Sequence, residues 1–423
     1  MAHILHLKCL ICGKTYRANE IDYVCPDHGD EGIVDVQYDY ERIGRRFSRD
    51  DLRRSTDTTI WRYKPLLPIE PDAAVPPLTV GWTPLYQTDR LAAELGLKRL
   101  WVKDDGRLPT ASFKDRASAI AVVKAQEKGA QVITTASTGN AAAALSGLCA
   151  SVKQPNVIFV PETAPQAKVA QLLTFGSTVM LVKGTYDDAF ELCMQAAHAY
   201  GWYNRNTGYN PYMSEGKKTV SFEICEQLGW QAPDRIFVSV GDGCIIGGVH
   251  KGLKDLLALG WIDRMPKLIG IQAEGSAYLY QAWRSGENVL TKPPIAAQTI
   301  ADSISAGLPR DRIKALAAVT ETNGAYLTVT DEEILAAIPA LARGCGVFAE
   351  PAGAAAFAGL VKAINQGLVA SDERIVVINT GNGLKDIASA MKAVNWVGTQ
   401  PYHVGPSLDE VQQVMASIPT PSL

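Results

Sequence analysis

The stretch ASFKDR, at residues 111–116, places Lys114 just before a helix rich in Ala and Val that we expect to begin near Ala117. A lysine amine becomes a nucleophile towards aldehydes when its surroundings lower its pKa, and proteins use such amines to form Schiff bases. Phe113 supplies an apolar neighbour. Considered alone, the stretch is explained more simply as a solvated lysine at a helix start, so the interpretation depends on three further motifs.

The second motif, TASTGN at residues 135–140, follows an apolar, strand-like run at residues 131–134. It opens an Ala-rich helix that we expect to reach Ala150. Hydroxyl groups, backbone N–H groups and a helix N-terminus meet in this turn, and together they suit an anion such as a substrate carboxylate. An ordinary strand-to-helix turn capped by Ser and Thr is the simpler explanation of this motif alone.

The third motif, GDGCIIGG at residues 241–248, follows a buried-strand pattern at residues 236–240 and precedes a helix that we expect from Val249 onwards. Glycines let the backbone approach a phosphate closely, and a helix N-terminus points N–H groups at it. The spacing lacks the full dinucleotide fingerprint. The motif therefore indicates a cup for a single phosphate.

The fourth motif, VVINTGNGLKD at residues 376–386, again reads as a strand, a glycine turn and a helix. Ligands of open α/β sheets sit at the carboxyl ends of the strands. Thr380 stands at such an end, where its hydroxyl can meet a ring nitrogen of a bound cofactor. A plain turn in which Thr380 caps the next helix is the alternative.

In this order, the four motifs resemble the threonine synthase family, within the tryptophan-synthase-β-like (fold type II) pyridoxal phosphate enzymes, from about Gly81 to about Lys392. The resemblance implies an α/β fold with two open, twisted, mostly parallel sheets covered by helices. It also implies that pyridoxal 5'-phosphate is the cofactor, an amino acid is the substrate and the protein is a homodimer. The implied roles are Lys114 as cofactor anchor and base; Phe113, Asn140 and Thr380 around the ring; Gly241, Asp242, Gly243, Cys244 and Ile245 around the cofactor phosphate; and Ser137, Thr138 and Gly139 at the substrate carboxylate.

Two positions depart from the family pattern. The family's N-P-x-R-x-E-G-x-K-T run carries an arginine that grips the phosphate of O-phosphohomoserine, and Met213 stands at that position here. A thioether cannot replace the charge-assisted bonds of a guanidinium. Either Arg205, Lys217 or Lys218 takes over this role, or the substrate carries no phosphate. Asp242 replaces a common asparagine and would repel a phosphate unless it points away to cap the helix.

The N-terminal region contains a candidate zinc site. Cys9-x-x-Cys12 is followed, after twelve intervening residues, by Cys25-x-x-His28, which is the spacing of a small zinc ribbon. All four positions of a tetrahedral Zn²⁺ would be filled by protein ligands, so a structural role is expected and a catalytic one is not. A metal-free β-hairpin is the alternative.

Composition limits the class of protein. The chain has 423 residues, of which 47% are hydrophobic, and a formal net charge of −3, so neither a nucleic acid nor a membrane is an expected partner. It shows no signal-peptide pattern and no apolar run of membrane-span length, which predicts a cytoplasmic protein. Four cysteines, Cys149, Cys193, Cys225 and Cys244, lie in contexts typical of reduced thiols.

We expect four regions: a zinc-ribbon-like segment at residues 1–44, a large cofactor-binding α/β domain at residues 45–105 and 201–400, a small α/β domain at residues 106–200, and a C-terminal extension at residues 401–423. The site should lie in the cleft between the two α/β domains, where closure excludes water.

The leading functional hypothesis is a lyase of the threonine synthase type, which converts O-phosphohomoserine to threonine and phosphate. A serine or threonine ammonia-lyase, or a β-replacement enzyme, is the alternative, and residues 299–304 resemble a segment that lines the site of such ammonia-lyases. Glu350 either faces the cofactor ring or is a helix N-terminal charge. A non-enzymatic, partner-binding paralogue is disfavoured, since Lys114, Asn140 and Thr380 are all present.

Overall fold

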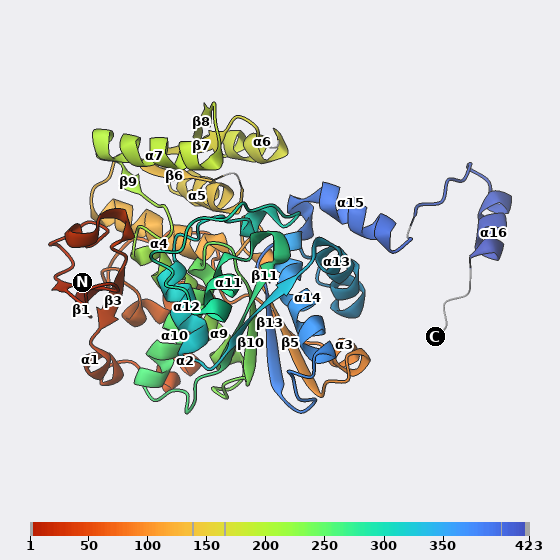
Figure 1. The fold of residues 1–423 in the computed structure, drawn as a ribbon, viewed down its shortest axis with the longest axis horizontal. Helices are drawn as coiled ribbons and strands as arrows, with labels where there is room; N and C mark the ends of the chain where they lie inside the picture. The colour runs from red at the N-terminus through yellow and green to blue at the C-terminus, as the bar shows by residue number, and fades with distance from the viewer. Residues whose placement is uncertain (1–2, 138, 165, 399, 419–423) are drawn as a thin grey trace.

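The computed structural model describes residues 3–137, 139–164, 166–398 and 400–418 (Figure 1). Of the predicted site residues, Thr138 lies outside these ranges. Two parallel sheets with covering helices make up most of the described chain, and the predicted α/β class is confirmed. None of the described helices is long and apolar enough to cross a membrane.

The larger sheet has six strands. Buried Val, Ile, Leu and Phe side chains dominate its central strands, which is the pattern of strands covered on both faces. All neighbours are parallel except the edge pair β4 and β5. The strand order is β12 (Ala325–Val329), β11 (Lys267–Ala273), β10 (Arg235–Ser239), β13 (Arg374–Asn379), β5 (Arg99–Asp104) and β4 (Leu85–Gln87).

The smaller sheet is entirely parallel. Its order is β8 (Thr178–Val182), β7 (Asn156–Pro161), β6 (Ile133–Ala136) and β9 (Tyr203–Asn204). Figure 1 shows it above the larger sheet, with α4 and α5 between the two. Residues just beyond β6 and β10 line one cavity, so the carboxyl ends of strands from both sheets face one region.

Helices alternate with the strands, as parallel connections require. The N-terminal half contains α1 (Tyr40–Gly44), α2 (Arg49–Arg54), α3 (Asp89–Glu94), α4 (Lys114–Glu127), α5 (Asn140–Ser151), α6 (Gln166–Thr174), α7 (Tyr186–Tyr200), α8 (Tyr212–Lys217) and α9 (Thr219–Gln227). The C-terminal half contains α10 (Cys244–Ala258), α11 (Tyr278–Ser285), α12 (Arg312–Thr320), α13 (Asp331–Cys345), α14 (Pro351–Asn365), α15 (Ile387–Trp396) and α16 (Leu408–Ser417).

Two helices begin earlier than the sequence indicated. Helix α4 begins at Lys114 instead of Ala117, and no side-chain cap marks its start, so the sequence carries no N-cap signal there. Helix α10 begins at Cys244 instead of Val249, directly after Gly243 with φ +87°. Its internal glycines serve packing, since a Cβ at Gly248 would lie 2.6 Å from the Cβ of Lys217.

The N-terminal segment forms an antiparallel sheet of β2 (Thr15–Tyr16), β1 (Ile4–Cys9) and β3 (Val34–Tyr38). Its buried side chains belong to the same hydrophobic cluster as α4 and α10, so the segment packs on the body of the protein. At the other end of the chain, α16 contains no buried residue and lies apart from the body (Figure 1). The proposed domain boundaries stay a prediction.

Candidate active site

A cavity of about 310 Å³ lies between elements of the two parallel sheets. Its lining includes residues just beyond the ends of β6 and β10, which is where open α/β sheets bind ligands. Of the predicted site residues, the cavity brings together Lys114, Ser137, Gly139, Asn140, Gly241, Asp242, Gly243, Cys244 and Ile245. Phe113, Thr380, Lys217 and Lys218 are not part of its lining.

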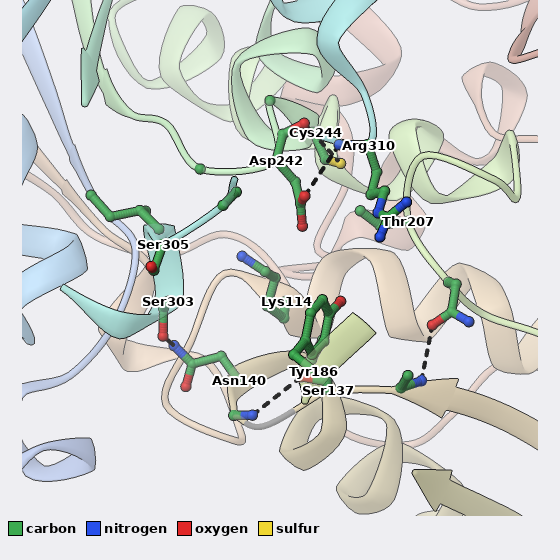
Figure 2. A pocket seen from close by; sticks show the side chains of 18 of the residues that line it. Lys114, Ser137, Asn140, Tyr186, Thr207, Asp242, Cys244, Ser303, Ser305 and Arg310 are labelled. Atoms are coloured by element: carbon green, nitrogen blue, oxygen red, sulfur yellow. Dashed lines mark hydrogen bonds between the residues drawn. The ribbon is translucent and has the colours of Figure 1, made fainter. Parts of the chain in front are cut away.

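Lys114, the first residue of α4, extends into the middle of the cavity, between Asp242 on one side and Asn140 on the other (Figure 2). Burial, the largest influence, lowers the pKa of its amine below the usual lysine value. The loop before it is fixed to the larger sheet, since the N–H of Phe113 donates to the carbonyl of Thr380 at the end of β13 (2.9 Å). The amine is therefore held in place and is more readily deprotonated than an exposed lysine.

Arg116, in the same motif, anchors α4 from behind. Its guanidinium is fully buried and pairs with Asp105 (2.6 Å) and with Glu223 (2.5 Å). Charge pairs of this kind compensate a buried cation. Arg116 is thus a positioning residue for the helix that carries Lys114.

The glycine-rich loop forms a cradle at the N-terminus of α10. A Cβ at Gly241 would lie 2.7 Å from the Cα of Ile304, and Gly243 takes a left-handed conformation, so both positions require glycine. The first N–H groups of α10 have no partner within the helix and are available to an anion. The buried Oγ of Ser239, which lines the cavity just before this loop, has no hydrogen-bond partner among the described residues.

Asp242 lines the cavity and does not cap α10. Its Oδ1 accepts a hydrogen bond from the backbone N–H of Arg310 (3.2 Å; Figure 2). Burial raises the pKa of this carboxyl above its usual value.

The turn after β6 supplies Ser137, Gly139 and Asn140 to the cavity. The side-chain amide of Asn140 donates to Oε1 of Glu350 (2.6 Å), and burial raises the pKa of that glutamate. Glu350 is the residue before α14 and lies behind the cavity lining, as Thr380 does. Asn140 therefore connects the cavity to Glu350.

The three residues discussed for a substrate phosphate have different surroundings. Lys218 pairs with Glu215 (2.5 Å) and Asp255 (2.7 Å), away from the cavity lining. Lys217 donates to the hydroxyl of Thr207 (2.7 Å), a residue that lines the cavity. Arg205 lines the cavity directly, whereas Met213 is buried in the hydrophobic core.

Several lining residues carried little sequence signal. Tyr186, Asp187 and Phe190 come from the start of α7, where only the capping residue Thr185 was recognisable as a pattern. Ser239 belonged to the strand pattern before the third motif but had no predicted role, and Arg310 stood outside any motif. Residues 302–308 also line the cavity, so part of the segment that resembles ammonia-lyases reaches it.

The predicted metal ligands meet in the N-terminal segment. The ligand atoms of Cys9, Cys12, Cys25 and His28 all lie within 4.8 Å of one another, and the sulfur of Cys25 is 3.5 Å from Nδ1 of His28. None of the four positions touches the cavity described above. This arrangement suits a tetrahedral ion that is remote from the chemistry.

Comparison with known proteins identifies the family. The sequence model for "Pyridoxal-phosphate dependent enzyme" matches residues 77–381. The chain belongs to this family. The predicted family, enzyme class and cofactor are thereby confirmed.

Among the relatives of this pyridoxal-phosphate-dependent enzyme are two archaeal threonine synthases. The protein from Methanocaldococcus jannaschii is 41% identical over 387 residues, which cover 91% of this chain and 94% of that protein. The protein from Methanosarcina acetivorans is 40% identical, with 97% and 98% covered.

Solved structures of the same fold include threonine deaminase isoform 2 from Solanum lycopersicum, with a TM-score of 0.65, 24% identity and coverage of 75% of this chain and 83% of that one. Diaminopropionate ammonia lyase from Escherichia coli has a TM-score of 0.64 and 21% identity, with 75% and 88% covered. At these identities the likeness concerns the fold alone.

The cavity of this family member fits pyridoxal phosphate. Lys114 offers an amine of lowered pKa for the aldehyde carbon. The loop at residues 241–245 and the unpartnered hydroxyl of Ser239 offer donors for the phosphate.

Proposed function

We propose that the protein is a threonine synthase, which converts O-phosphohomoserine and water into threonine and phosphate. The observation that carries this proposal is the similarity to threonine synthases at 40–41% identity over more than nine tenths of the chain. The cavity, with Lys114 at its centre, is consistent with it.

The chain's own residues would hold the cofactor in the following way. Lys114 holds the aldehyde carbon, and residues 241–245, with Ser239, hold the phosphate. The family resemblance also assigns Asn140, Thr380 and Phe113 to the ring, and of these three Asn140 lines the cavity. When bound, pyridoxal phosphate supplies an electron sink for negative charge on the substrate's carbon atoms.

Lys114 is the proposed base. With an amino acid bound in the cavity, the free amine of Lys114 would be placed to take the proton from the substrate's α-carbon. The lowered pKa of the amine favours the unprotonated form that this step needs. During the reaction the bond between Cγ and the phosphate oxygen breaks, one proton leaves Cβ, and Cγ gains one proton to become a methyl group. Water supplies the hydroxyl at Cβ, and its remaining proton balances the charge of the released phosphate. The protonated Lys114 can then return its proton to the product.

The turn at residues 137–139 is the proposed carboxylate site. Ser137 and Gly139 line the cavity immediately before α5, so the N–H groups at the start of that helix face the same space. A carboxylate bound there would hold the α-carbon near the amine of Lys114, which extends into the same cavity.

Three further properties belong to the proposal. Cys9, Cys12, Cys25 and His28 bind a structural Zn²⁺ in a ribbon-like head, which the close approach of their ligand atoms supports. The protein is cytoplasmic, which agrees with the eight free cysteines. It acts as a homodimer, as the family resemblance implies, without nucleic-acid or membrane partners.

The deciding experiment is a steady-state assay of the cofactor-loaded protein with O-phosphohomoserine, in which phosphate and threonine are followed together. Equal amounts of both products are expected. If neither appears and serine or threonine instead yields ammonia and a keto acid, the protein is an ammonia-lyase on this frame, and the proposed function is wrong.

A further inference from the structure

Arg205 is a buried cation that forms no ion pair with an acidic side chain of the residues that the structure describes. It follows β9, is 1% exposed and lines the cavity. Its recorded hydrogen bonds run from Nε and Nη2 to the single hydroxyl oxygen of Ser118, both at 3.2 Å. Buried charges are normally paired, as Arg116 is with Asp105 and Glu223. Desolvation lowers the pKa of Arg205 to about 10, so this end of the cavity favours an anion.

Lys217 is a second buried cation that lacks an acidic partner among the described residues. Its side chain is fully buried, and its amine donates to Oγ1 of Thr207 (2.7 Å) and to the carbonyl of Met213 (3.3 Å). Within the described ranges no carboxylate forms an ion pair with it, whereas its neighbour Lys218 has two such partners. Burial, together with the charges of Arg205 and other cations, lowers the pKa of Lys217 to about 7.

The two residues reach one place from different elements. Met213 and Lys217 are four residues apart on α8 and therefore share one face of that helix. From there Lys217 contacts Thr207, which lines the cavity with Arg205, two residues earlier in the chain. A lysine one turn further along α8 can thus supply the charge that Met213 lacks.

We propose that Arg205, Lys217 and Thr207 form the subsite that binds the phosphate group of the substrate. This inference rests on the proposed function, since it names the groups that recognise a phosphorylated amino acid. The proposal assigns the cofactor phosphate to the loop at residues 241–245, which lines the same cavity, so affinity for the cofactor and affinity for free phosphate have to be measured separately. The guanidinium and the ammonium would then each gain the anionic partner that they lack in the free protein.

The test uses the cofactor-loaded, full-length protein and inorganic phosphate as the probe. The variants are Lys217→Met and Arg205→Met, which remove charge, and Lys217→Arg, which keeps it. Lys392→Met, at an exposed position of α15, is the control. Calorimetry gives the dissociation constant for phosphate, an absorbance titration of the cofactor-free protein gives its affinity for pyridoxal phosphate, and kinetics separate KM from kcat.

We expect each charge-removing variant to weaken phosphate binding and to raise KM for O-phosphohomoserine by about tenfold or more, since each loses a charge-assisted hydrogen bond. Lys392→Met should stay within about threefold of the unmodified protein, and Lys217→Arg should retain more phosphate affinity than Lys217→Met because it keeps the charge. Cofactor affinity should be unchanged in all four variants.

Two results would overturn the assignment. Unchanged phosphate binding in both charge-removing variants would leave the subsite without support, even if the protein makes threonine. A loss of cofactor affinity at constant phosphate binding would place these cations at the cofactor phosphate instead. If the unmodified protein binds phosphate through Lys217 and Arg205 but does not turn over O-phosphohomoserine, the subsite stands and the proposed function fails.

Discussion

Lys114 is the single residue on which turnover is expected to depend most. Replacing it by alanine removes both the attachment point of the cofactor and the proposed base, so Lys114→Ala should lower kcat by about a thousandfold or more. The visible absorption of the cofactor joined to the lysine should also disappear, which a spectrum of the reconstituted variant checks. Lys392→Ala, on the surface of α15, is the matched control. A variant at Lys114 that keeps its activity would contradict the pyridoxal mechanism.

Lys217 gives a pH dependence with a defined sign. Because its pKa is lowered to about 7, the ammonium form is progressively lost as the pH rises through that value, and anion affinity should fall with it. Arg205 and Lys114 face this amine and lower its pKa, while Cys244 and Asp311 act in the opposite direction. Calorimetric titration with phosphate between pH 7.5 and 8.5 should show a loss of up to about tenfold per pH unit.

The Lys217→Arg variant should not show this loss, because a guanidinium remains charged over that range. An equal decrease in the variant and in the unmodified protein would assign the titration to another group.

Sequence patterns predicted the place of a residue in the site where its position at the end of a strand or the start of a helix is enough to fix its surroundings. Lys114 and Gly243 lie at strand-to-helix turns, and both reach the cavity. The patterns were silent where tertiary packing decides which way a side chain points. Lys217 and Lys218 are adjacent, yet one contacts Thr207 at the cavity while the other is neutralised by Glu215 and Asp255. Spacing along the chain cannot distinguish the two, since each depends on residues distant in sequence.

At the scale of elements, the N-terminal sheet provides a metal prediction. Its four candidate ligands come from the ends of β1 and from the segment after Val24, and their ligand atoms meet within 4.8 Å. We expect about one equivalent of zinc in protein purified without added metal, measured by mass spectrometry. Cys25→Ser should lose the metal and lower the melting temperature, because bound metal adds to the stability of the fold.

Cys345→Ser, outside the cluster and remote from the metal ligands in sequence, is the control for this experiment. If the purified protein contains no zinc, and if treatment with a chelator leaves its melting temperature unchanged, the N-terminal segment is a metal-free hairpin.

Most strands were predictable because the sheets are parallel and buried on both faces, so each strand appears as a short apolar run, such as Val376–Asn379 within β13. Helix starts were less predictable. Thr330 is followed by three acidic residues, which is the sequence pattern of a helix N-terminus, and in the structure Thr330 and Glu333 form a capping box at the start of α13. Helix α4, in contrast, has no side-chain cap. The start of a helix can therefore be predicted from the sequence where a capping side chain marks it, and not where such a side chain is missing.

At the scale of the whole molecule, elements of the two sheets are joined beside the cavity by two ion pairs. Lys168 pairs with Asp302 (2.5 Å) and Arg310 with Asp187 (2.7 Å). Both carboxylates line the cavity and are more than half exposed, so each pair should contribute no more than about 1 kcal/mol to keeping the two sides together. Sequence could not indicate these pairs, since each joins residues more than 120 positions apart.

The two ion pairs should help to keep the two sides of the cavity together, and removing them should therefore weaken substrate binding. The double variant Asp187→Asn/Asp302→Asn keeps the shape of both side chains and removes their charges, so KM should rise by about threefold to thirtyfold while kcat stays within about twofold. The difference from the unmodified protein should shrink at 1 M salt, where exposed charges are screened. Asp50→Asn is the control. It removes the exposed ion pair with Arg53, and neither residue lines the cavity. A collapse of kcat in the double variant would mean that one of these carboxylates takes part in the chemistry, because loss of closure alone would act on KM.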